Sequence, residues 1–138
     1  MDHLKEFEDD YFLFLEAGFI AINKADEDAA SKLFKACSLL KPDNMLSKVG
    51  EGYLHLHKLE LNKAIECFKE VVKKEPDNEM ANTMLGIALS LSPSKAKEGA
   101  EVLQKSLNNS NDDNIKSLAK DTLSFVDSNF KKNQDIPK

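Results

Sequence analysis

Apolar residues recur every three or four positions through most of this chain, and short polar or proline-containing segments interrupt the pattern. This periodicity is typical of amphipathic helices. It predicts an all-α protein with three helix pairs, at about 3–23 with 27–40, 44–58 with 61–74, and 78–91 with 95–108, and one last helix at about 113–131. Residues 132–138, KNQDIPK, lack the pattern and are expected to form a flexible tail.

Proline and short polar side chains mark the helix boundaries. Pro42 and Pro76 exclude the residue before them from helical geometry, so each is expected to end the second helix of a pair. Asp and Asn side chains accept hydrogen bonds from the first backbone N–H groups of a helix. The residues expected to open the helices that follow are Asp43, Asn44, Asp77, Asn78, Asp112 and Asp113.

Small and aromatic residues recur at a spacing of 34 along the chain. The matching positions are Gly18, Gly52 and Gly86, then Ala30 and Ala64, Phe34 and Phe68, and Pro42 and Pro76. In a third copy, Gly99 and Leu103 take the Ala and Phe places one residue late. Small residues let two helices approach closely, and the phenylalanines are expected to fill the space between neighbouring hairpins.

This period, with Gly early, Ala and Phe late and Pro at the end, resembles the tetratricopeptide repeat, a helix–turn–helix unit. The resemblance covers about residues 11–112 and implies a superhelix of three repeats, at about 11–44, 45–78 and 79–112. The helix at about 113–131 would cap the array, because a stack of repeats ends on a helix with one polar face. The chain is therefore expected to form one domain over residues 1–131.

The same resemblance implies a binding surface, because the first helix of each repeat lines the concave side of such a superhelix. The implied groove residues are nearly all apolar: Phe12, Leu15, Phe19 and Ile22, then Leu46, Val49, Tyr53 and Leu56, then Met80, Thr83, Met84 and Ile87. Such a groove would accept the apolar face of an amphipathic helix. It lacks the Lys, Asn and Arg clamp with which related domains hold the acidic tails of heat-shock chaperones. Leu13 and Ile20 are expected to face the place that a preceding repeat would take, and we expect them to form a second partner surface.

The apolar stretch DDYFLFLEAGFIAIN at residues 9–23 raises the alternatives of a signal peptide or a membrane span. Its flank, EFEDD, is acidic where a secretory signal requires basic residues. The run from Tyr11 to Ile22 is too short to cross a bilayer, and Glu16 interrupts it. A cytoplasmic protein is expected.

Composition and motifs argue against catalysis and nucleic-acid binding. The net charge is −5 and the chain contains no Arg, the residue that most often reads bases and phosphates. His55 and His57 lie two positions apart on a helix and point to different sides, so they are poor zinc ligands. Cys37 and Cys67 lack a CxxC pattern and are expected to be reduced. With no nucleotide or nucleophile motif either, we expect no enzyme, cofactor or metal.

Small acidic chains of three such repeats resemble the type III secretion chaperones of Gram-negative bacteria. The stretch VGEGYLHLHKLELNKAIECFKEVVKKEPDNEMA carries the likeness, with Gly50 and Gly52 leading to Ala64, Ile65 and Phe68. The length of the chain favours chaperones of the needle subunit over chaperones of pore-forming translocators. The likeness implies a secreted helical client and a small helical co-chaperone. The competing hypothesis is a scaffold repeat protein that self-associates through its first helix, as a homodimer without client.

Overall fold

The computed structural model describes residues 7–134, with the side chains of residues 8 and 130–134 excepted. The elements are η1 (Glu8–Asp10), α2 (Tyr11–Asn23), α3 (Glu27–Leu40), α4 (Leu46–His57), α5 (Leu61–Lys74), α6 (Glu79–Ser90), η2 (Pro93–Lys95), α7 (Ala96–Asn109) and α8 (Asp113–Gln134). Over these residues the chain is helical and contains no strand, which confirms the predicted all-α class.

The helix boundaries follow the predicted ones closely except at the two ends of the chain. The first α-helix begins at Tyr11, after a short 3-10 turn, and not near residue 3. Residues 1–6 lie outside the described residues. The last helix continues beyond the predicted end at 131 as far as Gln134, and residues 135–138 of the predicted tail lie outside the described residues.

Proline follows the ends of two helices, and Asn and Asp side chains cap the starts of others, as the sequence predicted. Helix α3 ends at Leu40 and α5 at Lys74, two residues before Pro42 and Pro76 respectively. Asn78 caps α6, because its side chain accepts a hydrogen bond of 3.0 Å from the backbone N–H of Ala81. Asp112 accepts a bond of 2.8 Å from Asn114 at the start of α8.

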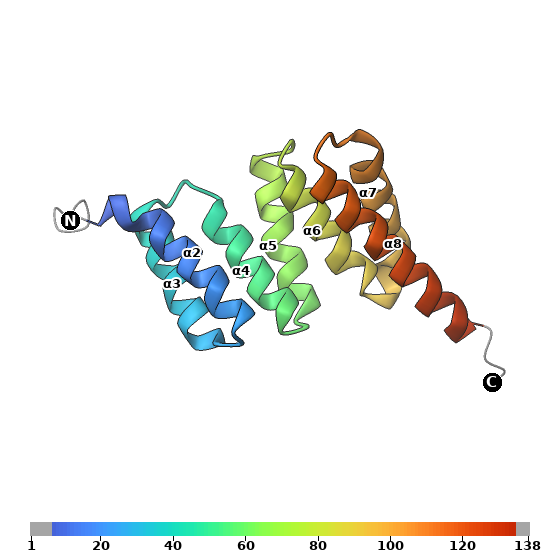
Figure 1. Cartoon of the computed structure of the whole chain (residues 1–138), viewed down its shortest axis with the longest axis horizontal. Helices are drawn as coiled ribbons and strands as arrows, with labels where there is room; N and C mark the ends of the chain where they lie inside the picture. The colour runs from blue at the N-terminus through green and yellow to red at the C-terminus, as the bar shows by residue number, and fades with distance from the viewer. Residues whose placement is uncertain (1–6, 135–138) are drawn as a thin grey trace. The chain divides into compact units, whose positions relative to one another are not determined.

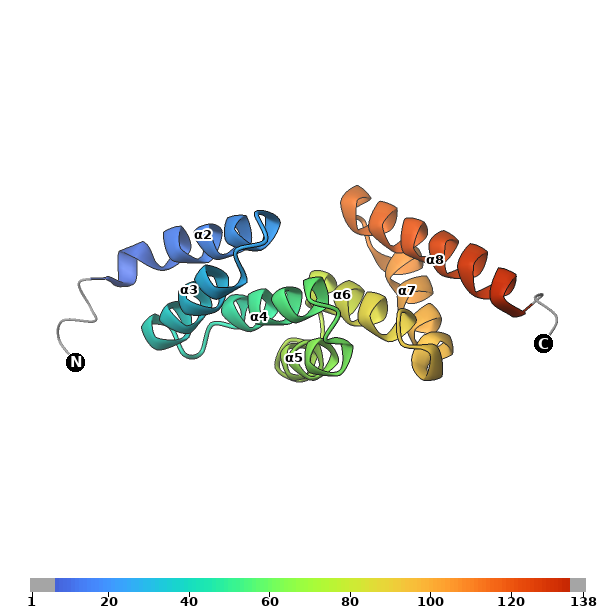
Figure 2. The same cartoon turned by 90° about the horizontal axis from the view of Figure 1, so that it is seen from below.

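The chain divides into two compact units, Met1–Val71 and Val72–Lys138, and each is described by itself. In the first unit α2 and α3 form an antiparallel hairpin, and α4 packs against both helices (Figure 1, Figure 2). In the second unit α6 and α7 form the hairpin, and α8 packs against α7 and α6 through the buried side chains of Ile115 and Ala119.

Phe34 holds the first unit together. Its ring is fully buried and lies against Gly18 of α2 and Gly50 of α4. A Cβ atom at Gly18 would stand 2.6 Å from Phe34 Cε1, and a Cβ at Gly50 would meet the same ring. The ring therefore fills the space between two successive first helices, as the repeat pattern predicted.

The same contact recurs one period later. The buried ring of Phe68 on α5 lies against Gly52 of α4, where an added Cβ would stand 2.6 Å from Phe68 Cε1. In the second unit Leu103 takes the aromatic place, 2.9 Å from the position of a Cβ at Gly86. In each of these hairpins a glycine of the first helix thus leaves room for a large side chain of the second helix.

The turns inside the first two hairpins also share one backbone geometry. Ala25 and Leu59, 34 residues apart, both have φ of 60°, in the left-handed region. The backbone N–H groups of the next residues, Asp26 and Glu60, bond to the carbonyls of Ala21 and His55 at 2.8 Å. This is the Schellman arrangement that ends many helices, usually with glycine at the left-handed position.

We expect Gly50→Ala to destabilise the protein by about 1 kcal/mol. Alanine favours a helix over glycine by about 1 kcal/mol, but overpacking a core costs about 1–3 kcal/mol, and the buried Phe34 ring has no free space. Urea unfolding of the single and double variants measures the effect. In a Phe34→Leu background the same Gly50→Ala change should be harmless, because the smaller side chain leaves room. Equal losses in both backgrounds would contradict the packing account.

Leu59→Gly should stabilise the protein by about 0.5–1 kcal/mol, because a left-handed backbone costs a non-glycine residue about 1–2 kcal/mol, partly offset by the greater chain entropy of glycine. Leu59 is 73% exposed, so little packing is lost. The matched control is Leu39→Gly, at a residue that is 68% exposed within α3. That change should destabilise the protein, and a stability loss with both variants would show that the turn at Leu59 is not strained.

Candidate partner-binding surface

The first helices of the repeats expose apolar residues at equivalent positions. Phe12 of α2 is 58% exposed, and its equivalents 34 and 68 residues later, Leu46 of α4 and Met80 of α6, are 40% and 45% exposed. We call these three residues the first row. Their similar exposure, each within its own unit, indicates that the repeat leaves this position open to solvent.

A second set of equivalent positions is half-buried. Phe19 of α2, Tyr53 of α4 and Ile87 of α6 form this second row, one residue from each first helix. The Phe19 ring lies 5.3 Å from the Phe34 ring and 5.9 Å from the Tyr53 ring, measured between centroids. Because Phe19 and Tyr53 come from different hairpins, this contact joins the apolar surfaces of α2 and α4 within the first unit.

Five predicted groove residues belong to the interior, four of them apolar, and this corrects the sequence interpretation. Leu15, Ile22, Val49 and Met84 are all buried. In α2 the spacing of Tyr11, Leu15, Gly18 and Ile22 places them on one stripe, which packs into the core of the first unit. Thr83 is buried as well, and its hydroxyl bonds to Glu79 O at 2.8 Å and to Ser106 Oγ at 3.2 Å.

The remaining predicted residues are accessible to differing degrees. Leu56 of α4 is half-buried. Leu13 and Ile20, the predicted second surface, are both well exposed on α2. They lie beside Glu16 and the partly exposed Ala17, and we call this the outer face of α2. The predicted groove therefore reduces to the two rows and Leu56, while the second surface is open.

Phe12 is held in place by its neighbours although most of its ring is exposed. The Tyr11 ring meets it edge to face with centroids 5.1 Å apart. Lys41 Nζ lies 5.2 Å from the centroids of both rings. A cation over an aromatic face adds a modest attraction at an exposed site, which orients the ring without covering it.

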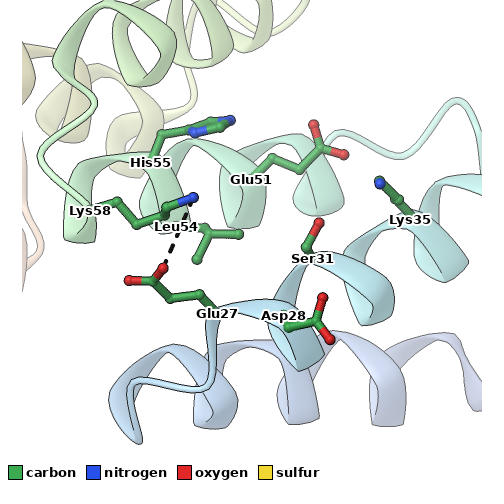
Figure 3. A pocket seen from close by; sticks show the side chains of 8 residues that line it. All are labelled: Glu27, Asp28, Ser31, Lys35, Glu51, Leu54, His55 and Lys58. Atoms are coloured by element: carbon green, nitrogen blue, oxygen red, sulfur yellow. Dashed lines mark ion pairs between the residues drawn. The ribbon is translucent and has the colours of Figure 1, made fainter.

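A polar cavity of about 530 Å³ between α3 and α4 escaped the sequence analysis (Figure 3). Its lining carries both signs of charge: Glu27, Asp28, Ser31, Lys35, Glu51, Leu54, His55 and Lys58. Lys58 Nζ lies 4.0 Å from Glu27 Oε2, so one pair of opposite charges spans the two helices (Figure 3). Its lining residues come from two separate stretches of the sequence, 27–35 and 51–58, and only the fold brings them together.

Two polar networks join α4 to α5. Lys48 lies 3.3 Å from Glu51 on its own helix and 3.5 Å from Glu70 on α5. Glu60, at the turn before α5, contacts Lys58 and Lys63 at 3.1 Å and His55 Nδ1 at 3.3 Å. These contacts tie α4 to α5 by charge.

Neither cysteine thiol lies in surroundings that would make it reactive. Both thiols are free, and the buried Cys37 donates to the carbonyl of Tyr11 at 3.7 Å. Burial raises the pKa of Cys67 to about 11, although Lys48 nearby opposes the rise. A thiol with so high a pKa is a poor nucleophile at neutral pH.

The part of the chain that the structure describes contains neither a candidate metal site nor a candidate membrane span. No three His, Cys, Asp or Glu side chains there are grouped to hold a metal ion. No helix within residues 7–134 has the length and apolar character needed to cross a membrane.

The fold and the surface define an all-α protein of helical hairpins with exposed apolar positions on its first helices. Comparison of the chain with protein-family models, curated proteins and solved structures gave no match.

The ion pairs and hydrogen bonds of Glu60 make the stability of the fold depend on pH. Hydrogen bonds from Lys58, Lys63 and His55 lower the pKa of Glu60 from 4.5 to about 2. A carboxylate with a lowered pKa stabilises the folded state above pH 4.5, and this contribution is lost as the pH falls from 4.5 towards 2. The difference in urea midpoint between the native protein and Glu60→Gln should therefore shrink over that range. Glu66→Gln, on the exposed side of α5, measures the effect of removing one charge. A Glu60→Gln difference that stays constant from pH 5 to pH 2 would contradict the network.

Proposed function

We propose that this protein is a helical-repeat binding protein of the tetratricopeptide class that holds the apolar face of a helix from another protein. The observation that carries the proposal is the first row, Phe12, Leu46 and Met80, exposed at the same place in each first helix. Phe19 and Tyr53 of the second row extend this apolar surface on α2 and α4. An amphipathic partner helix presents apolar residues on one face at intervals of one or two turns. These residues could contact the exposed apolar side chains of the first helices.

The chemistry of the two rows favours an apolar partner over an acidic peptide. Neither row contains a Lys or Asn side chain of the kind that clamps a carboxylate. Aromatic and methionine side chains supply large, adaptable contacts instead. Charged residues of both signs surround the polar cavity between α3 and α4, and that cavity plays no part in the proposed binding.

The proposed client is a secreted helical subunit, and the needle subunit of a type III secretion system is the favoured candidate. This finer proposal rests on the sequence resemblance of the 34-residue units and on the apolar rows. The protein would keep its client monomeric before secretion by covering the helix through which the client polymerises.

Co-expression tests this proposal directly: the needle subunit should stay monomeric with the native protein and should polymerise with a Leu46→Glu variant. Chaperoning of a pore-forming translocator is the alternative, and it predicts this effect on a translocator helix instead.

The general binding proposal is tested with a defined peptide. Three or four buried anchors contribute about 1.5–3 kcal/mol each, and association costs about 4–15 kcal/mol. An 18-residue amphipathic helix with Leu at helical spacing should therefore bind weakly, with a Kd on the order of 10–100 µM. Fluorescence anisotropy measures it, and a peptide of the same composition in scrambled order is the ligand control.

Leu46→Glu should weaken this peptide binding about tenfold or more, because it removes one anchor and buries a charge. Leu39→Glu is the matched protein control, since Leu39 is exposed on the second helix α3 and lies in neither row. Equal affinity for the ordered and scrambled peptides, or equal losses with both variants, would overturn the proposal. Phe19→Glu is a poor test, because the contact of Phe19 with Phe34 ties it to the core.

A further inference from the structure

The outer face of α2 has an apolar centre with opposite charges at its two ends. Leu13 and Ile20 are exposed and lie seven residues apart, which is close to two turns of one helix face. Asp9 lies before the helix at one end, and Lys24 follows it at the other. Both charged side chains are exposed, and among the described residues neither forms an ion pair.

These positions are symmetric about one point of the helix. The midpoint between Leu13 and Ile20 falls between Glu16 and Ala17, and so does the midpoint between Asp9 and Lys24. If a second copy of α2 runs antiparallel across this point, Leu13 lies opposite Ile20 of the other copy. Asp9 then lies opposite Lys24 of the other copy, at both ends of the contact. A face that is complementary to itself in this way satisfies the requirement of a two-fold symmetric interface.

We propose that the outer face of α2 is a homodimer interface, in which a second copy of this chain packs antiparallel with Leu13 against Ile20 and Asp9 against Lys24. A single helix face covers less than the roughly 800 Å² per partner of a stable interface, so the dimer is weak. Glu16 lies next to the symmetry point and meets its own copy, and this repulsion weakens the pair further. The interface contains no residue of either row, so it is separate from the residues proposed to bind a client helix.

Sedimentation velocity of the full chain at low salt, from about 10 µM to 1 mM, tests the dimer. The sedimentation coefficient should rise with concentration for the native protein. Leu13→Glu should abolish the rise, and Glu16→Ala should shift it to lower concentration. Leu46→Glu, which removes a first-row residue, should leave self-association unchanged, whereas Leu13→Glu should leave peptide binding unchanged. The two proposals can therefore fail separately. Far-UV circular dichroism checks that each variant is folded, as expected for substitutions at exposed positions.

Charge exchange tests the antiparallel register. Asp9→Lys alone and Lys24→Asp alone each place like charges opposite one another, so each should self-associate about tenfold more weakly. An equimolar mixture of these two variants restores both opposite-charge contacts and should associate like the native protein, as should the Asp9→Lys/Lys24→Asp double variant. A native protein that is monomeric at 1 mM, or that associates to the same extent with Leu13→Glu, overturns the proposal. If the mixture associates no more strongly than either variant alone, the proposed antiparallel register is wrong.

Discussion

The close approach of helices around Phe34 is the contact on which the first unit depends. Gly18 and Gly50 come from two successive first helices, and both lie against one buried ring. Without that approach α2 could not pack near enough to α4 for Phe19 to meet Tyr53. The recurrence of the glycine–aromatic contact at Gly52 and Phe68 shows why the sequence repeats with a spacing of 34: each copy must place a small residue opposite a large one.

This packing also decides which apolar residues remain exposed. The stripe of Tyr11, Leu15, Gly18 and Ile22 is committed to the core, so the apolar residues on the other sides of α2 are left exposed. The same division holds in α4 and α6, where Val49 and Thr83 are buried while Leu46 and Met80 are exposed. A helix that is apolar nearly all round serves both the interior and a surface.

The sequence predicted the helices well because their limits depend on local chemistry. Pro42, Pro76 and Asn78 act within one or two residues of the boundaries they mark, and the repeat spacing aligned the copies independently. The faces of α2 were harder, because a helix with apolar residues on every side gives no amphipathic pattern. The sequence did contain one indication of the exposed face. Glu16 is charged and is expected to face solvent, and Phe12 and Ile20 lie one helical turn from it, whereas Leu15 and Ile22 do not.

The polar features could not be found from the sequence, because they join residues distant along the chain. The contact of Lys48 with Glu70 and the cavity between α3 and α4 exist only once the helices are packed. The left-handed turns at Ala25 and Leu59 were also hidden, since glycine usually marks that geometry and neither position carries it.

We propose that the exposed apolar positions of the first helices, taken in each unit by itself, contact a partner helix. Methionine methyl NMR tests it most directly, because Met80 lies in the first row while Met45 is buried beside α4. On titration with the amphipathic peptide, the Met80 methyl signal should shift in proportion to binding, and it should shift more than the signal of the buried Met45. An unchanged Met80 signal at saturating peptide would contradict the account.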